Sequence, residues 1–265
     1  MNREIINNAV KRLNCALKLD RKIAGIKFLF DKDEFDNAGA KALKVRMPYC
    51  VMVRNAMEGK FLKATADSIG CFGGAKAVGM MEADEQSLSG RFYHKLGLYN
   101  DLATAKNVQQ NVTFCKHKLF GIMTGPLDKY TDEPDIVIII TNPYNGMRIM
   151  QAYSYMYGCN TSLKMTGNQA ICSECTSYPF ENNNINVSFL CAGTRYKAKW
   201  KDDELAIGFP FNRFLSIEKG LYDTIDVIEP NEKKDELQIR FKEQGIECPD
   251  IHYNRNYYTG LNPTD

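Results

Sequence analysis

A glycine-flanked cysteine, Cys71, stands at the centre of residues 68–74, which read Ser-Ile-Gly-Cys-Phe-Gly-Gly. The residues before it have the pattern of a strand and those after it the pattern of a helix. The Cys71 thiol is therefore predicted to face the start of that helix, where free backbone N–H groups and the positive dipole end favour a thiolate. A thiolate binds metal or attacks an electrophile, so the segment predicts a chemical site without naming a reaction.

Two further cysteine groups have neighbours that suit chemistry. Cys172 and Cys175 form a C-x₂-C pair, a spacing typical of metal chelates and redox dithiols, with Glu174 between them as a potential ligand or proton carrier. Cys191 ends a predicted strand beside a glycine, and Arg195 could hold an anion or stabilise a thiolate. The plain alternatives are core packing for the cysteines and a surface ion pair for the arginine.

The overall composition limits which ligands, compartment and partners can be expected for this protein. The chain has nine cysteines, an odd number, and its start lacks the apolar core of a signal peptide, so we expect a cytoplasmic protein without a disulfide framework. With only three histidines, thiolates and carboxylates are the ligands on offer. A net charge of +2 gives no reason to expect nucleic acid or membrane as a partner.

Hydrophobic periodicity predicts short helices and strands that alternate along the chain. Helices are predicted at 3–19, 33–43, 51–58, 72–81, 90–110, 147–157, 211–227 and 231–244. Strands are predicted at 22–30, 61–69, 114–123, 135–141, 162–166, 186–191, 196–200 and 204–209, with a polar tail at 250–265. The pattern favours one domain over residues 1–265, of mixed α/β (α+β) class, with a sheet flanked by helices.

A weak internal repeat relates segments 22–81 and 133–180. Each has a strand, a Pro-Tyr pair before a helix, an extended stretch containing Leu-Lys, and then a cysteine. Chance similarity and two pseudo-repeated β-α-β halves are both open. Duplication would predict that the halves superpose and that Cys71 and Cys172 meet at a pseudo-twofold axis.

Four motifs resemble those of an uncharacterised prokaryotic family, domain of unknown function 169 (DUF169), over residues 20–215. They are Gly70-Cys71-Phe72-Gly73-Gly74, Asn142-Pro143-Tyr144-Asn145-Gly146-Met147, Cys172-Ser173-Glu174 and Cys191-Ala192-Gly193-Thr194-Arg195. The family pattern has proline where Phe72 stands and alanine where Gly146 stands, and neither departure removes a candidate ligand. The resemblance implies that Cys71, Cys172, Glu174 and Cys191 matter together, but it brings no established activity.

Three functional hypotheses follow from these residues. The first is an oxygen-sensitive iron–sulfur protein, with a cluster (4Fe–4S) on Cys71, Cys172 and Cys191 and a fourth ligand from Cys50 or Cys175. It would transfer electrons or act as an oxidoreductase on a small molecule, with a substrate or a redox protein as partner. A homo-oligomer is left open.

The other two hypotheses need no cluster. In a metal-free thiol enzyme, Cys71 would be the nucleophile, Glu174 the acid/base and Arg195 the anion anchor. In a non-enzymatic module, a small ligand or metal would bind between the two halves.

Overall fold

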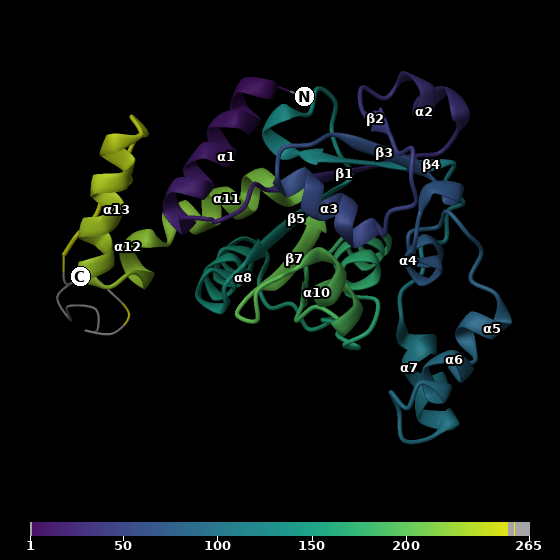
Figure 1. The fold of residues 1–265 in the computed structure, drawn as a ribbon. Helices are drawn as coiled ribbons and strands as arrows, with labels where there is room; N and C mark the ends of the chain where they lie inside the picture. The colour runs from purple at the N-terminus through teal and green to yellow at the C-terminus, as the bar shows by residue number, and fades with distance from the viewer. Residues whose placement is uncertain (1, 254–256, 258–265) are drawn as a thin grey trace.

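Seven strands form one sheet in the computed structural model, which describes residues 2–253 and 257 (Figure 1). The spatial order is β2-β3-β4-β1-β5-β7-β6, and only β2 and β3 pair in parallel. The strands are β1 (Ala24–Leu29), β2 (Lys41–Ala42), β3 (Leu62–Thr65), β4 (Gly121–Pro126), β5 (Ile136–Thr141), β6 (Asn186–Ser188) and β7 (Leu205–Pro210). The predicted mixed α/β class is confirmed.

Helices pack on both faces of the sheet (Figure 1). One face carries α1 (Arg3–Leu17), α8 (Pro143–Tyr157) and α11 (Phe214–Asp223). The other carries α3 (Tyr49–Met57), α4 (Phe72–Ala77), the π-helix η3 (Ala170–Ser177) and α10 (Ala192–Ala198). The remaining α-helices are α2 (Lys32–Asn37), α5 (Glu85–Leu88), α6 (Arg91–Lys95), α7 (Leu102–Asn111), α9 (Tyr178–Asn182), α12 (Ile225–Ile228) and α13 (Asn231–Glu243). Within the described residues, no helix is long and apolar enough to cross a membrane.

The central strand β5 divides two hydrophobic cores. Ile136, Ile138 and Ile140 join the core beneath α3, whereas Val137 and Ile139 join the core beneath α8. Alternate side chains of a strand point to opposite faces, so a strand covered on both sides must be apolar throughout. This requirement explains why β5 is the clearest strand signal in the sequence.

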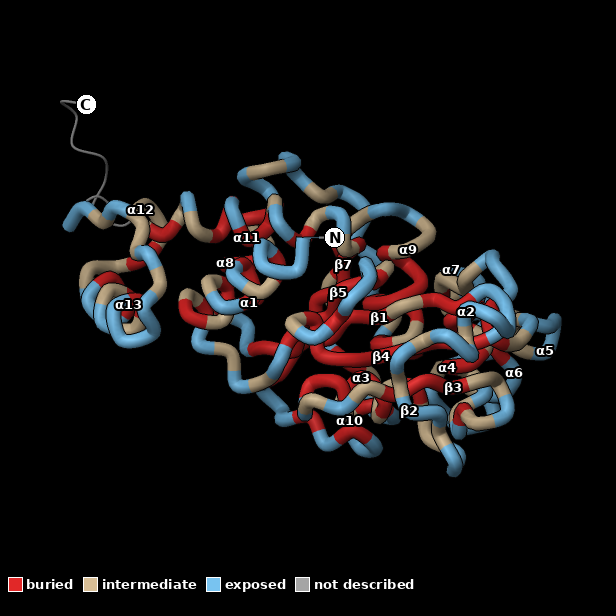
Figure 2. The backbone as a smooth tube through the Cα atoms, turned by 90° about the horizontal axis from the view of Figure 1, so that it is seen from above, coloured by how far each residue is buried: buried red, intermediate tan, exposed pale blue. Residues whose placement is uncertain are grey.

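Two helical groups extend beyond the sheet at opposite ends (Figures 1 and 2). Helices α5–α7 pack on one another beyond α4. A smaller share of their residues is buried than in the sheet (Figure 2). At the other end, α13 packs against α1, where Cys15 is buried with Ile225, Leu237 and Phe241. Most of the predicted polar tail lies outside the described residues.

Two predicted strands are wrong. Residues 162–166 form no regular element, and residues 196–200 include the end of helix α10. The alternation of Tyr196, Ala198 and Trp200 with lysines predicts a strand, but Tyr196 is 75% exposed while Ala198 and Trp200 are buried. The buried residues Thr194 and Ala198 are four apart, the spacing of one helix face, and α10 packs against α3.

The segments of the proposed repeat differ in their elements. Segment 22–81 contributes β1, β2 and β3, whereas segment 133–180 contributes β5 and then the π-helix in place of a second strand. Their Pro-Tyr helices, α3 and α8, lie on opposite faces of the sheet. The β-α-β order is thus not repeated, and a common origin of the two segments stays a prediction.

Candidate functional site

Four cysteines from separate segments lie within electrostatic reach of one another. Burial raises the pKa of the Cys172 thiol well above its ordinary value. Charge on three neighbouring thiols raises it further, those of Cys191, Cys71 and Cys50. Burial also raises the pKa of Cys50, and Cys191 and Cys71 again add to the effect. All four thiols are reduced and partly exposed. We refer to Cys50, Cys71, Cys172 and Cys191 as the cysteine cluster.

Each member of the cysteine cluster stands at the start of a helix. Cys71 and Cys191 are the N-cap residues of α4 and α10, Cys50 is the second residue of α3, and Cys172 is the third residue of η3. Helix α3 packs against the other three helices. Because the first N–H groups of a helix lack intrahelical acceptors, they stabilise negative charge on such sulfurs.

Unusual backbone precedes two of these helices. Gln169 has φ 53° just before η3, and Leu190 has φ 68° just before Cys191. Non-glycine residues rarely adopt this left-handed region, and such residues concentrate at binding and catalytic sites. The π-helix that carries Cys172 is itself a rare element found often at functional sites.

A hydroxyl beside Cys50 supports its sulfur. The buried Thr194 hydroxyl donates a hydrogen bond towards Cys50, which opposes the burial-induced rise of its pKa. The indole Nε1 of Trp200 in turn donates to Thr194 Oγ at 3.0 Å. The indole therefore orients the hydroxyl, in the way that outer hydrogen bonds orient ligands around metal sites. Thr194 belongs to the Cys-Ala-Gly-Thr-Arg motif, but the sequence analysis does not name it as a site residue.

Cys175 is not among the thiols that act electrostatically on Cys172 and Cys50. It is completely buried in the core beneath α3, and Glu174 is the charged neighbour that adds to the rise of its pKa caused by burial. The predicted tight turn with two sulfurs on one side is wrong, because Cys172 and Cys175 lie on a π-helix. Residues three apart in a helix with i→i+5 hydrogen bonds do not share a face. Of the two candidates for a fourth ligand, Cys50 is the one that lies with the others.

Glu174 and Arg195 are engaged with other partners. Glu174 is 3% exposed; its Oε1 accepts hydrogen bonds from Thr166 N at 2.6 Å and Thr166 Oγ at 3.1 Å, and its Oε2 accepts one from Ser188. The Arg195 guanidinium donates to three backbone carbonyls, those of Lys201, Phe189 and Glu204. These contacts join loops and strands around the site, and the acid/base and anion-anchor roles stay predictions.

Two substitutions at Glu174 separate structural support from acid/base chemistry. We expect Glu174→Ala to lower the free energy of unfolding by about 3 kcal/mol, because buried donors lose their acceptor. Glu174→Gln keeps an acceptor and should cost less than about 1.5 kcal/mol. Urea unfolding of both variants measures the contrast. Wild-type stability in both would show that the carboxylate does not hold the loop, and would favour the acid/base role.

The Asn-Pro-Tyr-Asn-Gly motif, residues 142–146, lies at the start of α8, on the face of the sheet opposite the cysteine cluster. Asn142 caps α8, and the buried Asn145 amide donates to Leu17 O at 2.8 Å and Thr141 Oγ at 3.0 Å. Tyr144 donates to Glu229 at 2.5 Å. The motif thus fixes α8 against its neighbours and does not reach the cysteine cluster.

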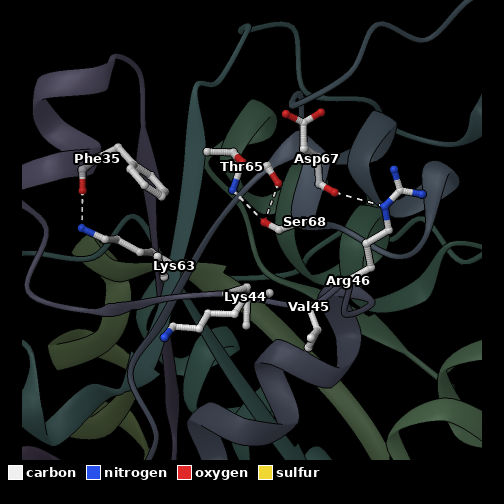
Figure 3. A pocket seen from close by; sticks show the side chains of 10 residues that line it. Phe35, Lys44, Val45, Arg46, Lys63, Thr65, Asp67 and Ser68 are labelled. Carbon is white, nitrogen blue, oxygen red and sulfur yellow. Dashed lines mark hydrogen bonds between the residues drawn. The ribbon is translucent and has the colours of Figure 1, made fainter.

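Two cavities of the described structure lie elsewhere. One, of about 350 Å³, is at the β2–β3 edge, where Lys63 donates to Phe35 O and Arg46 donates to Asp67 O (Figure 3). The second, of about 900 Å³, lies beside α2. Neither is lined by a cysteine. In the first cavity Lys63 and Arg46 are already bonded to backbone carbonyls, and we assign no chemistry to either cavity.

Among the described residues, no group of three or more His, Cys, Asp or Glu side chains could hold a metal ion.

Tyr93 of α6 is a second residue near the cysteine cluster that the sequence analysis does not predict. Burial raises its pKa to about 12, and Cys172, Cys71 and Cys191 contribute to the rise, so its hydroxyl lies near the cysteine cluster.

The fold and site together define a mixed α/β protein in which four thiols near helix starts lie within electrostatic reach of one another. Residues 12–220 match the profile of DUF169, described as "Uncharacterised ArCR, COG2043", and the chain belongs to this family. It is 28% identical over 220 residues to the uncharacterized protein MJ0308 of Methanocaldococcus jannaschii, across 82% of this chain and 94% of that protein. No solved structure matches the chain significantly.

Proposed function

We propose that this protein binds an iron–sulfur cluster through Cys50, Cys71, Cys172 and Cys191, and that it acts in the cytoplasm in electron transfer or in redox chemistry on a small molecule. The observation that carries the proposal is the meeting of these four thiols from distant segments. Thiolates hold such clusters in fours. No cysteine outside this set is needed.

The number of neighbouring thiols matches the ligand number of a cluster. Charge on Cys191, Cys71 and Cys50 contributes to the raised pKa of Cys172, so the four thiols lie within electrostatic reach of one another. In a cubane cluster each thiolate would bind a different iron, and the cluster itself would separate the sulfurs.

The surroundings suit a negatively charged group. Each of the four cysteines stands at a helix start, where free N–H groups and the positive dipole end would offset part of the charge of a thiolate. When bound, the cluster would supply one-electron chemistry. The chain's own residues would set its potential through these N–H groups, through the Thr194 hydroxyl and through burial.

Anaerobic purification with iron and sulfide analysis tests the proposal. We expect brown protein with about four irons and four sulfides per chain, absorbing near 400 nm and bleaching in air. Reconstitution with ferrous iron and sulfide should give the same content if the cluster is lost during purification. Colourless protein that takes up neither iron nor sulfide would contradict the proposal.

Cluster uptake should also depend on pH. Burial raises the pKa of Cys172 and Cys50, so both are protonated near neutral pH in the metal-free protein, and binding must displace their protons. Reconstitution at low iron concentration should therefore improve from about pH 6.5 to about pH 8.5. Iron bound per chain is the measurement. A flat profile would show that the thiols are already ionised.

The metal-free thiol enzyme has less support. Its proposed acid/base and anion anchor, Glu174 and Arg195, are held by Thr166, Ser188 and backbone carbonyls. No described contact places either side chain against the Cys71 thiol.

A further inference from the structure

Helix α10 leads away from the cysteine cluster with one side uncovered. Cys191 is the N-cap residue of this helix, so the uncovered side begins next to one of the four thiols. One side of α10 packs on α3, whereas Gly193, Tyr196 and Lys197 are exposed. These three positions are three and four residues apart, the spacing of neighbours on one helix surface.

Phe189 is a second exposed aromatic residue beside the same thiol. Its side chain is 63% exposed, and its carbonyl oxygen accepts a hydrogen bond from Arg195 Nη2 of α10 at 2.8 Å. The backbone of Phe189 is therefore fixed against α10. The Nζ atom of Lys199 lies 4.5 Å from the centre of the Tyr196 ring, which holds a cation beside that ring. We use the name α10 surface for Phe189, Gly193, Tyr196, Lys197 and Lys199.

Gly193 allows another molecule to come close to the Cys191 sulfur. A Cβ placed on Gly193 would lie 4.0 Å from Cys191 Sγ. Because Gly193 is exposed and has no side chain, nothing at this position shields the sulfur from an approaching surface. A partner on the α10 surface would therefore lie next to one ligand of the proposed cluster.

The chain segments that carry the cysteine cluster are basic, although the whole chain has a net charge of only +2. Nine lysines and arginines, and no aspartate or glutamate, occur in residues 44–57, 69–81, 164–173 and 189–201. Arg54, Lys76 and Lys201 pair with carboxylates outside these segments. Among the described residues, no ion pair includes Lys197 or Lys199. The α10 surface thus offers two exposed cations beside two exposed aromatic rings.

This combination fits an acidic protein better than a nucleic acid. Aromatic residues are enriched in protein–protein interfaces, and a basic patch steers an acidic partner towards it. Nucleic-acid-binding proteins carry a stronger positive field than a net charge of +2 provides. The exposed Asp202 and Asp203, which follow the last basic segment, would repel a phosphate backbone and would help to orient an acidic protein.

We propose that the α10 surface is the docking surface for a small acidic electron-transfer protein. The inference rests on the proposed function, because such a carrier has a role only if the cysteine cluster holds a redox centre. The reduced carrier gives one electron to the oxidised iron–sulfur cluster next to Cys191. The carrier is thereby oxidised and the cluster reduced, and no covalent bond forms or breaks. Interfaces of this kind are small, so a few charges and aromatic rings suffice to form them.

Electron carriers of opposite charge test the inference. The probes are two acidic carriers, a plant-type ferredoxin and a flavodoxin, and a basic c-type cytochrome, each titrated against anaerobically reconstituted protein by microscale thermophoresis. At least one acidic carrier should bind saturably at about 25 mM salt, and about tenfold more weakly at about 250 mM salt. The cytochrome should show no saturable binding. Absence of saturable binding by both acidic carriers, or equal binding of the cytochrome, would overturn the inference.

Matched variants locate the binding. The double variant Lys197→Glu/Lys199→Glu should weaken binding of the acidic carrier about tenfold, and Phe189→Ser about fivefold. The control Lys11→Glu/Lys242→Glu makes the same change of net charge at exposed positions of α1 and α13 and should leave the affinity unchanged. Wild-type affinity in the Lys197–Lys199 variant or in Phe189→Ser would overturn the docking surface. Equal weakening by the two double variants would also overturn it, because net charge alone would then explain the binding.

Iron and sulfide assays on the same preparations separate the two proposals. A full cluster complement in protein that binds neither acidic carrier would overturn the docking surface and leave the cluster standing. Carrier binding that depends on Lys197 and Lys199, in protein that takes up no iron, would support the docking surface and contradict the cluster. Tighter binding of a single-stranded DNA of about 20 nucleotides than of either carrier, lost in the Lys197–Lys199 variant, would assign the surface to nucleic acid and overturn the inference.

Discussion

Cys172→Ala is expected to remove the bound iron and sulfide, whereas Cys175→Ala, three residues along the same π-helix, should keep both. Cys172 lies with three other thiols, and a site that loses one thiolate loses a bond and its charge balance. Cys175 is completely buried in the core, and none of those thiols contributes to the rise of its pKa. Its truncation should lower the free energy of unfolding by only about 1 kcal/mol.

The measurement is iron and sulfide per chain with melting temperature, on variants prepared anaerobically. Cys50→Ala, Cys71→Ala and Cys191→Ala should behave like Cys172→Ala, and Cys71→Ser excludes a cavity effect because it nearly keeps the volume. Cys15→Ala, at the buried contact between α1 and α13, is a second packing control. If loss of Cys172 and loss of Cys175 had equal, small effects, the cysteine cluster would be ordinary packing.

The largest effect on stability is expected from Arg148→Ala. Arg148 is 1% exposed, and its Nε donates to Glu229 Oε1 at 2.6 Å, while its Nη2 donates to Leu221 O at 3.2 Å. Removing one partner of a buried ion pair leaves an uncompensated charge, so the free energy of unfolding should fall by about 3–5 kcal/mol. Urea unfolding measures the change.

A surface pair provides the control for this variant. Lys32 pairs with Asp36, and the two side chains are 70% and 53% exposed. Lys32→Ala should therefore cost less than about 1 kcal/mol. Arg148 acts on the face opposite the cysteine cluster, so folded Arg148→Ala should keep wild-type iron content. A change below about 1 kcal/mol would show that Arg148 does not hold α8 and α12 together.

Local sequence patterns predict much of the fold because the forces behind them are local. The short run of β-branched residues in β5 favours a strand covered on both faces, and the spacing of Ile6, Val10 and Leu13 favours one face of a helix. The glycine-flanked Cys71 marks a helix start for the same reason, whereas the helix that follows Cys191 is not predicted. Prediction fails at residues 196–200, where an alternating pattern is overruled by the packing of α10 on α3.

The sequence by itself determined the α/β class and which cysteines have neighbours that suit chemistry. It could not decide between Cys50 and Cys175, because C-x₂-C spacing is uninformative until the helix type is known, and a π-helix turns the two sulfurs apart. Tertiary structure also placed Tyr93, Asn168 and Gln169 beside the thiols. Those contacts join segments about 75 to 100 residues apart in the chain, and they depend on how α6 and η3 pack, which no local pattern records.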